Sequence, residues 1–420
     1  MPCRMLLLDR DGTLVKRDMR HRYLYGDHEF ELLPDVADCL RSLQQRGVST
    51  AICTNQQGVS LPEFPDMTIE AVERFHARLN QKFASFGVEP LRFFVCPHNG
   101  DDQCQCRKPA PGLLQDAMVA HNVRATESWF VGDQLTDMLA AKRAAVQPVY
   151  LSPEDTETID DGVVGVGNWQ SICRLQRLGF TSAYPKDQLE LPVKESTDWI
   201  RLNQVAYDGI AESYVAKTSR FASIEQDFIS RLYRTHLRGS EDGFIVDCGC
   251  GPARDAEFLL RFGWMYLGVD NSKGMLSVAA ARLRPLVEGN WALLNANMLS
   301  FDLPEQSVAF FVCNSSIQHI DSERLKPWLR RIRSFLRRNG LLYLHFRVGH
   351  GKRKEWSYEY KQEGICRLNF YHRSDDLSDL LKGLGFEIVL NEQYVTDYEK
   401  DDVCKKTQVP WMCRIVAKKV

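Results

Sequence analysis

The sequence predicts an α/β protein with two doubly wound domains, each built on a mostly parallel sheet. Three observations predict it: the chain length, two separate series of alternating strands and helices, and a polar segment between them. The chain has 420 residues, and a single hydrophobic core stops growing near about 250–300 residues. Its hydrophobic fraction of 44% and charged fraction of 26% are ordinary for folded proteins. We therefore expect two folded domains.

Short apolar runs alternate with amphipathic stretches, which predicts parallel strands joined by crossover helices. The expected strands of the first series are Met5–Leu8, Thr50–Cys53, Arg92–Cys96, Trp129–Val131 and Pro148–Leu151. Those of the second series are Phe244–Cys248, Met265–Val269, Trp291–Leu294, Val308–Cys313 and Leu341–Phe346. Between the two series, a polar segment bracketed by prolines is typical of a linker. We place the domains at residues 1–180 and 196–420, with a linker at 181–195.

Charge and the N-terminal residues exclude several classes of partner. Residues 1–190 carry 20 Lys+Arg and 26 Asp+Glu, and residues 191–420 carry 33 and 29, so their net charges are −6 and +4. Neither half is basic enough to indicate a nucleic-acid partner. The first apolar run is too short for a signal peptide or a membrane span. We expect a cytoplasmic protein without membrane association, whose 13 cysteines are thiols or metal ligands. The sequence leaves the oligomeric state open.

Two acidic residues follow the first predicted strand. Asp9 and Asp11 stand at positions i and i+2, so both can face the same side at the carboxyl edge of the sheet. One carboxylate can attack phosphorus while the other handles protons, and Gly12 allows a sharp turn after them. A divalent cation would be needed to offset two acids and a phosphoryl group. Taken alone, however, an Asp-x-Asp pair is also typical of a solvated turn.

Three further motifs occur in the same domain at strand ends or helix starts. They are Thr54-Asn55-Gln56, Arg107-Lys108-Pro109, and Gly132-Asp133 followed by Asp137. With the Asp-x-Asp-Gly-Thr motif, this order resembles the haloacid dehalogenase superfamily of phosphatases over about the first 175 residues. The resemblance implies a Rossmann-like phosphatase domain that depends on Mg²⁺.

The resemblance also implies residue roles in phosphate transfer. Asp9 would be the nucleophile that becomes aspartyl-phosphate, and Asp11 would protonate the leaving alcohol and then activate water. Thr54, Asn55 and Lys108 would hold the phosphoryl group.

The same resemblance implies a magnesium site. Asp133, the Asp9 carboxylate and the backbone carbonyl of Asp11 would ligate Mg²⁺. Asp137 lies four residues after Asp133, and we leave open whether it is a ligand or a helix-capping acid.

Three thiols and an imidazole gather within eleven residues. Cys96, His98, Cys104 and Cys106 match the ligands of a closed tetrahedral zinc site. The alternative is buried free cysteines, but the Gly-Asp-Asp segment between them has no core in which to bury them. We expect a structural Zn²⁺ that rigidifies the loop carrying Arg107.

This zinc loop resembles that of histidinol-phosphate phosphatases and heptose bisphosphate phosphatases. The five-residue gap between His98 and Cys104 looks more like the former. About twenty residues separate Leu14 from Pro34, too few for a cap domain, so the phosphatase would be capless. We expect Arg107 to grip the non-reacting part of the substrate or a second anion. The alternative is a surface arginine paired with Asp101 or Asp102.

The second domain begins with Asp247-Cys248-Gly249-Cys250-Gly251 after a predicted strand. Glycines 249 and 251 allow close approach of a ligand to a helix start, and Asp270 at the tip of the next strand can accept bonds from two ribose hydroxyls. The pattern predicts an adenosine-containing ligand, either a nicotinamide dinucleotide or S-adenosylmethionine.

The Asp-x-Gly-x-Gly form resembles class I S-adenosylmethionine-dependent methyltransferases over about residues 196–420. Nicotinamide sites favour a third glycine, and Arg254 stands in that place. The resemblance implies that S-adenosylmethionine is bound by Asp247, Gly249, Gly251, Asp270, Asn297 and Asn314. Asn297 replaces the family's frequent acid, and its carbonyl could accept a bond from the adenine amino group. Cys248 and Cys250 are expected to pack as small residues.

The methyl acceptor should lie near the end of the fourth strand. His319 is therefore our candidate general base for a substrate hydroxyl. The alternative is a histidine that packs under a lid. His345 and Arg347 could also line the pocket, and residues 351–354 are expected to form a solvated loop.

Taken together, these features predict a bifunctional biosynthetic enzyme. One domain would hydrolyse a small phosphorylated metabolite, a sugar or amino-alcohol phosphate, and the other would methylate the same or a neighbouring intermediate, by O-methylation. In one alternative, the methyltransferase acts first and uses the phosphate as a handle. In another, the N-terminal domain is a zinc-stabilised docking or regulatory module.

Overall fold

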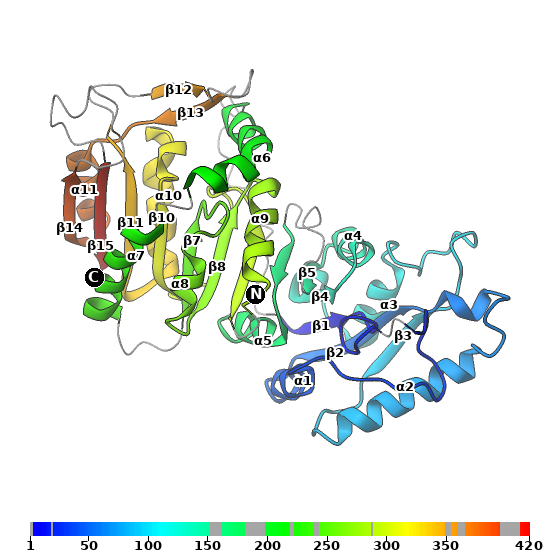
Figure 1. Cartoon of the computed structure of the whole chain (residues 1–420). Helices are drawn as coiled ribbons and strands as arrows, with labels where there is room; N and C mark the ends of the chain where they lie inside the picture. The colour runs from blue at the N-terminus through cyan, green and yellow to red at the C-terminus, as the bar shows by residue number, and fades with distance from the viewer. Residues whose placement is uncertain are drawn as a thin grey trace. The chain divides into compact units, whose positions relative to one another are not determined.

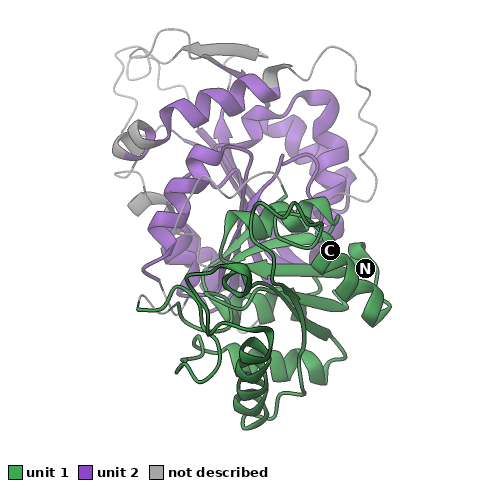
Figure 2. Cartoon of the chain, turned by 90° about the vertical axis from the view of Figure 1, so that its right-hand side faces the viewer, with its two compact units in different colours: residues 1–184 green, residues 185–420 purple. Residues whose placement is uncertain are grey.

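The structure, a computed structural model, divides into two compact units, Met1–Tyr184 and Pro185–Val420 (Figure 2). The predicted linker at residues 181–195 lies outside the residues that the structure describes. The described residues are 3–17, 20–151, 162–180, 198–218, 222–237, 243–286, 289–348, 354–358, 366–394 and 412–420.

The first unit contains a parallel sheet with the strand order β6-β5-β4-β1-β2-β3 (Figure 1). Its strands are β1 Met5–Leu8, β2 Ser49–Asn55, β3 Arg92–Cys96, β4 Ser128–Gly132, β5 Gln147–Leu151 and β6 Val164–Val166. Its helices are α1 Val36–Gln45, α2 Ile69–Ala84, α3 Gly112–His121, α4 Leu135–Arg143 and α5 Trp169–Arg177, with 3₁₀ turns at Gln57–Ser60 and Ala125–Glu127.

The strand order explains where the acidic motifs meet. β1 lies between β4 and β2, and Leu8 pairs with Val131 and with Ile52. The apolar runs of β1 and β4 are buried along their whole length, as expected of strands covered by helices on both faces. All five predicted strands occur, and the short β6 escaped prediction because three residues carry no clear pattern. The residues following β1, β2 and β4 therefore share one edge.

Contacts at the helix ends and between helices stabilise the helices around this sheet. Thr68 caps α2 by accepting a bond from the Ala71 amide at 3.2 Å. Helices α1 and α5 pack together and bring Cys39 and Cys173 into a disulfide, with their Cα atoms 5.8 Å apart. This pair departs from our expectation of reduced thiols, because a sequence separation of 134 hides the proximity of the two cysteines.

The second unit contains a sheet with the order β14-β15-β11-β10-β7-β8-β9. Its first five strands along the chain are parallel, and β15 runs antiparallel between β11 and β14. Its strands are β7 Phe244–Cys248, β8 Met265–Asp270, β9 Trp291–Asn295, β10 Val308–Asn314, β11 Leu336–Arg347, β14 Phe386–Tyr394 and β15 Met412–Lys419, with a separate hairpin of β12 Lys354–Tyr358 and β13 Cys366–Phe370. Its helices are α6 Asp198–Thr218, α7 Ala222–Leu232, α8 Ala256–Leu260, α9 Lys273–Leu283, α10 Ser322–Phe335 and α11 Ser374–Gly383, with a π turn at Tyr233–Leu237 and a 3₁₀ turn at Ile317–His319.

Helix α6 is fastened across α9 and β13 (Figure 1). The Asp208 carboxylate accepts bonds from the Ser272 hydroxyl at 2.7 Å and the Gly274 amide at 3.0 Å. Gly274 permits this contact, because a Cβ there would lie 2.9 Å from the Asp208 carbonyl oxygen. One face of α6 therefore lies over the carboxyl ends of β8 and β10. Among the described helices, none has the length and apolarity to cross a membrane.

Candidate active sites

A buried ion-pair triad lies at the carboxyl edge of the first sheet. Lys108 Nζ lies 2.7 Å from Asp9 Oδ1 and 2.8 Å from Asp137 Oδ1. Burial raises the pKa of both carboxyls, to about 6 for Asp137, although Lys108 opposes the shift. Lysine at this place therefore compensates two acids that the fold has removed from water.

A third carboxylate completes an acidic cluster. Oxygen atoms of Asp9, Asp133 and Asp137 lie within 4.8 Å of one another. Burial raises the pKa of Asp133, and Arg17 opposes this shift through a 2.8 Å contact between its Nε and Asp133 Oδ2. These hard oxygen ligands, crowded and partly uncompensated, fit Mg²⁺. Gly12 preserves the space, because a Cβ there would lie 2.0 Å from Asp133 Oδ2.

Asp137 combines the two alternatives left open by its spacing. Its Oδ2 accepts a bond from the Gln134 amide at 3.1 Å in a capping box at the start of α4. Its other oxygen faces Lys108 inside the acidic cluster. Asp137 is thus a capping acid that also belongs to the candidate cation site.

The loops after β2 and before α3 are tied to each other. Asn55 Nδ2 donates to the Lys108 carbonyl, and Asn55 Oδ1 accepts from the Lys108 amide, both at 3.0 Å. This two-point pairing holds the lysine backbone beside β2. Thr54 is buried, and its hydroxyl accepts a 2.8 Å bond from Gln56 Nε2. Asn55 is therefore placed to orient Lys108.

Asp11 does not join the acidic cluster among the described residues. Its carboxylate instead faces Arg10, whose Nε and Nη2 lie 3.0 and 2.8 Å from its two oxygens. Burial favours the neutral acid, but Arg10 and Gln56 outweigh burial and lower the pKa of Asp11. Asp11 is thus held as a carboxylate beside the cluster.

The candidate zinc ligands converge after β3. Cys96 Sγ lies 3.6 Å from both His98 Nδ1 and Cys104 Sγ, and Cys106 Sγ lies 3.3 Å from His98 Nδ1 and 3.4 Å from Cys104 Sγ. A tetrahedral zinc with Zn–S bonds of about 2.3 Å would separate two sulfurs by about 3.8 Å. All four ligand atoms lie within 4.8 Å of one another, so the residues fit a closed zinc site.

Arg107 follows directly on this loop. Its amide donates to Cys104 Sγ at 3.3 Å, and its Nη1 donates to the His98 carbonyl at 3.3 Å. The Asp102 carboxylate accepts a bond from the Asn99 amide. The loop thus holds the guanidinium against its own backbone.

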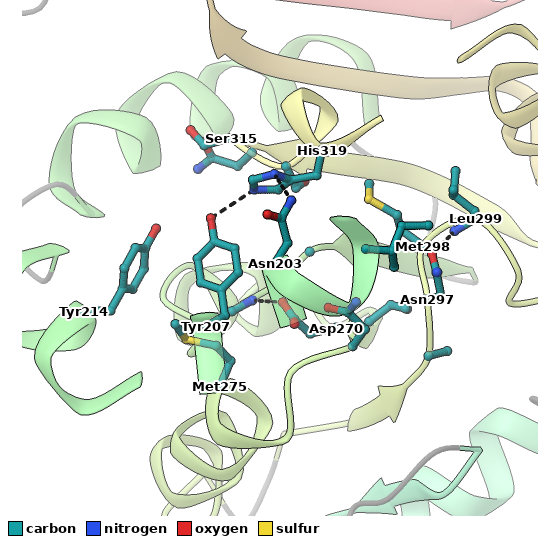
Figure 3. A pocket seen from close by; sticks show the side chains of 18 residues that line it. Asn203, Tyr207, Tyr214, Asp270, Met275, Asn297, Met298, Leu299, Ser315 and His319 are labelled. Carbon is teal, nitrogen blue, oxygen red and sulfur yellow. Dashed lines mark hydrogen bonds between the residues drawn. The ribbon is translucent and has the colours of Figure 1, made fainter. Parts of the chain in front are cut away.

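The second unit contains a pocket at the carboxyl ends of β8, β9 and β10, covered by α6 (Figure 3). Among the predicted residues, its lining includes Gly249, Gly251, Asp270, Asn297, Asn314 and His319. Asp270 is fixed by the Gly251 amide at 2.8 Å and the Ser272 amide at 2.9 Å. Burial raises its pKa to about 6, although both amides oppose the shift. Each oxygen keeps a second lone pair for a ligand hydroxyl.

Two asparagines of the lining are already oriented by neighbours. Asn297 Oδ1 accepts a 2.9 Å bond from the Leu299 amide. Asn314 Oδ1 lies 2.7 Å from His345 Nδ1, and its Nδ2 donates to Asp255 at 3.3 Å. The carbonyl predicted to accept from adenine thus has one lone pair left.

Asp247 lies outside the pocket lining. Its Oδ2 accepts a 2.9 Å bond from the Tyr266 hydroxyl, and burial together with the nearby Asp255 raises its pKa to about 7. Cys248 and Cys250 are buried free thiols, as small-residue packing requires. The structure therefore separates Asp247 from the other predicted cofactor residues.

His319 is held by side chains of α6, as Figure 3 shows. Its Nε2 lies 3.0 Å from the Tyr207 hydroxyl and its Nδ1 lies 3.2 Å from Asn203 Nδ2. Burial lowers its pKa to about 4, and Arg367 adds to the shift while the Leu368 carbonyl opposes it. The imidazole is thus neutral and directed at a tyrosine.

Sequence reasoning missed Asn203 and Tyr207 as site residues. Both line the pocket, and Arg367 Nη1 donates to the Tyr207 hydroxyl at 3.0 Å. The available signal was their spacing, because Asn203, Tyr207 and Tyr214 recur at i, i+4 and i+11 on one helical face.

Family models match both units. The model for haloacid dehalogenase-like hydrolases matches residues 3–145, and the methyltransferase domain model matches residues 245–340. A D-glycero-beta-D-manno-heptose-1,7-bisphosphate 7-phosphatase of Pseudomonas putida is 35% identical over 161 residues, which cover 38% of this chain and 89% of that protein. The chain belongs to the haloacid dehalogenase-like hydrolases through its first unit. Its second unit carries a class I methyltransferase domain, so the chain combines a phosphatase domain with an S-adenosylmethionine-dependent methyltransferase domain.

Other relatives of the phosphatase domain include a second heptose bisphosphate phosphatase and a histidine biosynthesis protein. The Neisseria meningitidis serogroup A heptose bisphosphate 7-phosphatase is 32% identical, covering 35% of this chain and 76% of that protein. A histidine biosynthesis bifunctional protein of Baumannia cicadellinicola is 28% identical, covering 41% and 45%.

Solved structures resemble each domain. For the phosphatase domain, the D,D-heptose 1,7-bisphosphate phosphatase of B. bronchiseptica, complexed with magnesium and phosphate, is 28% identical with a TM-score of 0.33, covering 36% of this chain and 80% of that chain. For the methyltransferase domain, the Burkholderia thailandensis 1,6-didemethyltoxoflavin-N1-methyltransferase is 16% identical with a TM-score of 0.42, covering 57% and 95%.

Proposed function

We propose that the phosphatase domain hydrolyses a small phosphomonoester through an aspartyl-phosphate on Asp9. The observation that carries this proposal is the buried Lys108, which ion-pairs with Asp9 and Asp137 at the edge where Asp133 also presents its carboxylate. A docking module would have no use for such a cluster of buried charges, which are costly to desolvate. A catalytic site benefits from them, because a phosphoryl group needs both a nucleophile and positive charge.

Bond changes in the proposed reaction follow from these groups. Asp9 forms a bond to phosphorus while the bond from phosphorus to the alcohol oxygen breaks. Asp11 gives a proton to that oxygen and then takes one from the water that hydrolyses the aspartyl-phosphate. Since Arg10 keeps Asp11 ionised in the structure, the carboxylate must gain this proton as the substrate binds. Lys108 and Thr54 hold the phosphoryl oxygens, with Asn55 orienting Lys108.

Metal ions would complete the phosphatase domain. Asp9 and Asp133, with the Asp11 carbonyl, would hold Mg²⁺, which neutralises charge on the phosphoryl group. Cys96, His98, Cys104 and Cys106 would hold a structural Zn²⁺.

The substrate is proposed to be a phosphorylated sugar. Heptose bisphosphate 7-phosphatases are among the relatives that this chain covers over most of their length. This favours a sugar phosphate over histidinol phosphate, which the short zinc loop alone had suggested. Arg107, which precedes Lys108 and donates to the His98 carbonyl of the zinc loop, would bind a second anionic group of the substrate.

Turnover of p-nitrophenyl phosphate with Mg²⁺ tests the nucleophile. Asp9→Asn should abolish turnover, whereas Asp38→Asn, an exposed position on α1, should leave it unchanged. Residual turnover of the Asp9 variant near the native level would exclude an aspartyl-phosphate on this residue.

For the methyltransferase domain, we propose that Asp270 binds the ribose hydroxyls of S-adenosylmethionine. Gly249 and Gly251 would allow the close approach of the cofactor, while Asn297 and Asn314 would contact its adenine and methionine ends. Asp247 would act indirectly, through Tyr266 and the β7–β8 pairing. When bound, the cofactor supplies an electrophilic methyl group on sulfur.

We further propose O-methylation of a hydroxyl, with His319 acting through Tyr207. The acceptor oxygen would form the bond to the methyl carbon as the carbon–sulfur bond breaks, and its proton would pass to the Tyr207 oxygen as that hydroxyl passes its own to His319 Nε2. The 3.0 Å contact between the Tyr207 hydroxyl and His319 Nε2 supports this path of proton transfer. Both Tyr207→Phe and His319→Gln should then lower single-turnover methyl transfer by about 100-fold or more.

A mass-spectrometric screen tests the bifunctional assignment. Phosphorylated metabolites are incubated with the protein, Mg²⁺ and S-adenosylmethionine, and each product is examined for lost phosphate and for added methyl. Methylation only of phosphorylated compounds would support a methyltransferase that acts first and uses the phosphate as a handle.

A further inference from the structure

Arg10 is a charged residue at a position where the fold buries it completely. Its exposed fraction is 0%, and it stands between the two acids of the Asp-x-Asp motif. Its guanidinium grips both oxygens of Asp11, donates to the Leu24 carbonyl at 2.8 Å, and lies 4.7 Å from the ring centre of Phe75. A buried guanidinium is costly unless every donor has a partner.

His76 supplies a further partner behind the arginine. Its Nε2 lies 3.1 Å from Arg10 Nη1, and since a guanidinium only donates, the imidazole must accept with that nitrogen. The ring stacks on Phe93 with centres 3.9 Å apart. Burial, followed by Arg10, lowers its pKa to about 3. His76 is therefore a neutral hydrogen-bond acceptor that holds the guanidinium in one orientation.

Gln56 also hydrogen-bonds to the Asp11 carboxylate. Its Nε2 lies 3.2 Å from Asp11 Oδ2 and 2.8 Å from the Thr54 hydroxyl, and its Oε1 accepts from Arg10 Nη2 at 3.1 Å. One network therefore links Asp11 to the threonine expected to bind phosphate.

We propose that Arg10, braced by His76 and Gln56, is a positioning residue that aligns the Asp11 carboxyl with the leaving oxygen of the substrate. The proposal rests on the proposed role of Asp11 as acid and base. Two parallel bonds from one rigid fork fix the plane of a carboxyl group, which a lysine ammonium cannot do.

The test compares two leaving groups in single-turnover experiments with excess enzyme and Mg²⁺. p-Nitrophenolate departs without a proton, whereas the glycerol oxygen of glycerol 3-phosphate needs one. Arg10→Lys should slow release of glycerol by about 10-fold or more and change release of p-nitrophenol by less than about 3-fold. Asp11→Asn should show the same selective loss. Arg78→Lys is the matched control, because Arg78 holds the nearby Gly26 and His28 carbonyls without touching Asp11.

Equal slowing of both substrates by Arg10→Lys, or no slowing of either, would overturn the positioning role. If Arg10→Lys does not fold, as judged by its thermal transition, Gln56→Met takes its place with the same selective loss expected. Failure of the native protein to release p-nitrophenol would refute the proposed phosphatase chemistry itself. A selective loss in Arg10→Lys without one in Asp11→Asn would contradict the role of Asp11.

Discussion

Lys108 shows how one side chain can serve both stability and chemistry. It is 3% exposed, and it compensates two carboxyls whose pKa burial has raised. Removing one partner of a buried pair leaves the other charges without compensation, which is far more costly than losing a surface ion pair.

Replacement of Lys108 by methionine should therefore destabilise the phosphatase domain by about 3 kcal/mol. Urea denaturation without added metal measures the effect, and saturating Mg²⁺ should recover part of it by offsetting the acids. Lys82→Met, at an exposed site above the Phe86 ring, is the matched control. If both substitutions lower the free energy of unfolding equally, the buried triad contributes no more to stability than an exposed lysine does.

The raised pKa of Asp270 predicts opposite pH trends for the stability of the folded protein and for binding of S-adenosylmethionine. Its pKa is about 6 in the folded protein against an ordinary 3.8, so the folded state holds this proton more tightly than the unfolded state. Its contribution to the free energy of unfolding is therefore largest below pH about 4 and falls as the pH rises to about 6. Affinity for S-adenosylmethionine should rise over the upper part of that window, because the ribose hydroxyls need the carboxylate.

Calorimetric titrations with S-adenosylmethionine between about pH 5 and pH 7.5 measure this prediction. Asp270→Asn should remove the pH trend, and Asp270→Ala should weaken binding on the order of 10- to 100-fold. Affinity that does not change with pH in the native protein would exclude a carboxylate contact at this residue.

At the scale of elements, the Asn203 side chain of α6 pairs with the backbone of β13. Asn203 Oδ1 accepts from the Leu368 amide at 2.8 Å, and its Nδ2 donates to the Leu368 carbonyl at 3.0 Å. The Asn203 side chain thus bonds to the Leu368 backbone as a neighbouring strand would, and it holds α6 over the pocket. Loss of the pair should therefore loosen both elements.

Asn203→Ala should accordingly speed hydrogen exchange across α6 and residues 366–370, and weaken S-adenosylmethionine binding several-fold. Mass spectrometry of exchanged peptides locates the change. Leu202→Ala, on an exposed neighbour of the same helix, provides the control and should leave β13 protected.

The zinc loop is the corresponding element of the phosphatase domain. Three of its four candidate ligands follow β3 within the stretch that ends at Arg107 and Lys108, so an ordered loop sets the position of both cations. Cys104→Ser and Cys106→Ser should lower the zinc content, raise the KM for a phosphorylated substrate, and leave methyl transfer unchanged. Metal analysis and paired activity assays test this, and full zinc in both variants would rule out the site.

For the whole molecule, two units with separate cores predict two unfolding transitions. S-adenosylmethionine should raise one transition temperature, and Mg²⁺ with inorganic phosphate should raise the other, since a ligand stabilises the unit that binds it. Differential scanning calorimetry measures both. Asp270→Ala should cancel only the first shift, and a single transition moved by either ligand would contradict independent cores.

The sequence by itself determined both folds and the family of each domain, because strand runs, glycine turns and motif acids are local in the chain. It also proposed Asp9, Lys108, Asp133 and the four candidate zinc ligands, and the structure brings these residues together in two clusters. Only the tertiary structure decided where Asp11 and Asp247 face, that His319 is directed at Tyr207, and that Cys39 meets Cys173. These depend on contacts between distant segments, and on how burial and neighbouring charges shift each pKa, which no local pattern records.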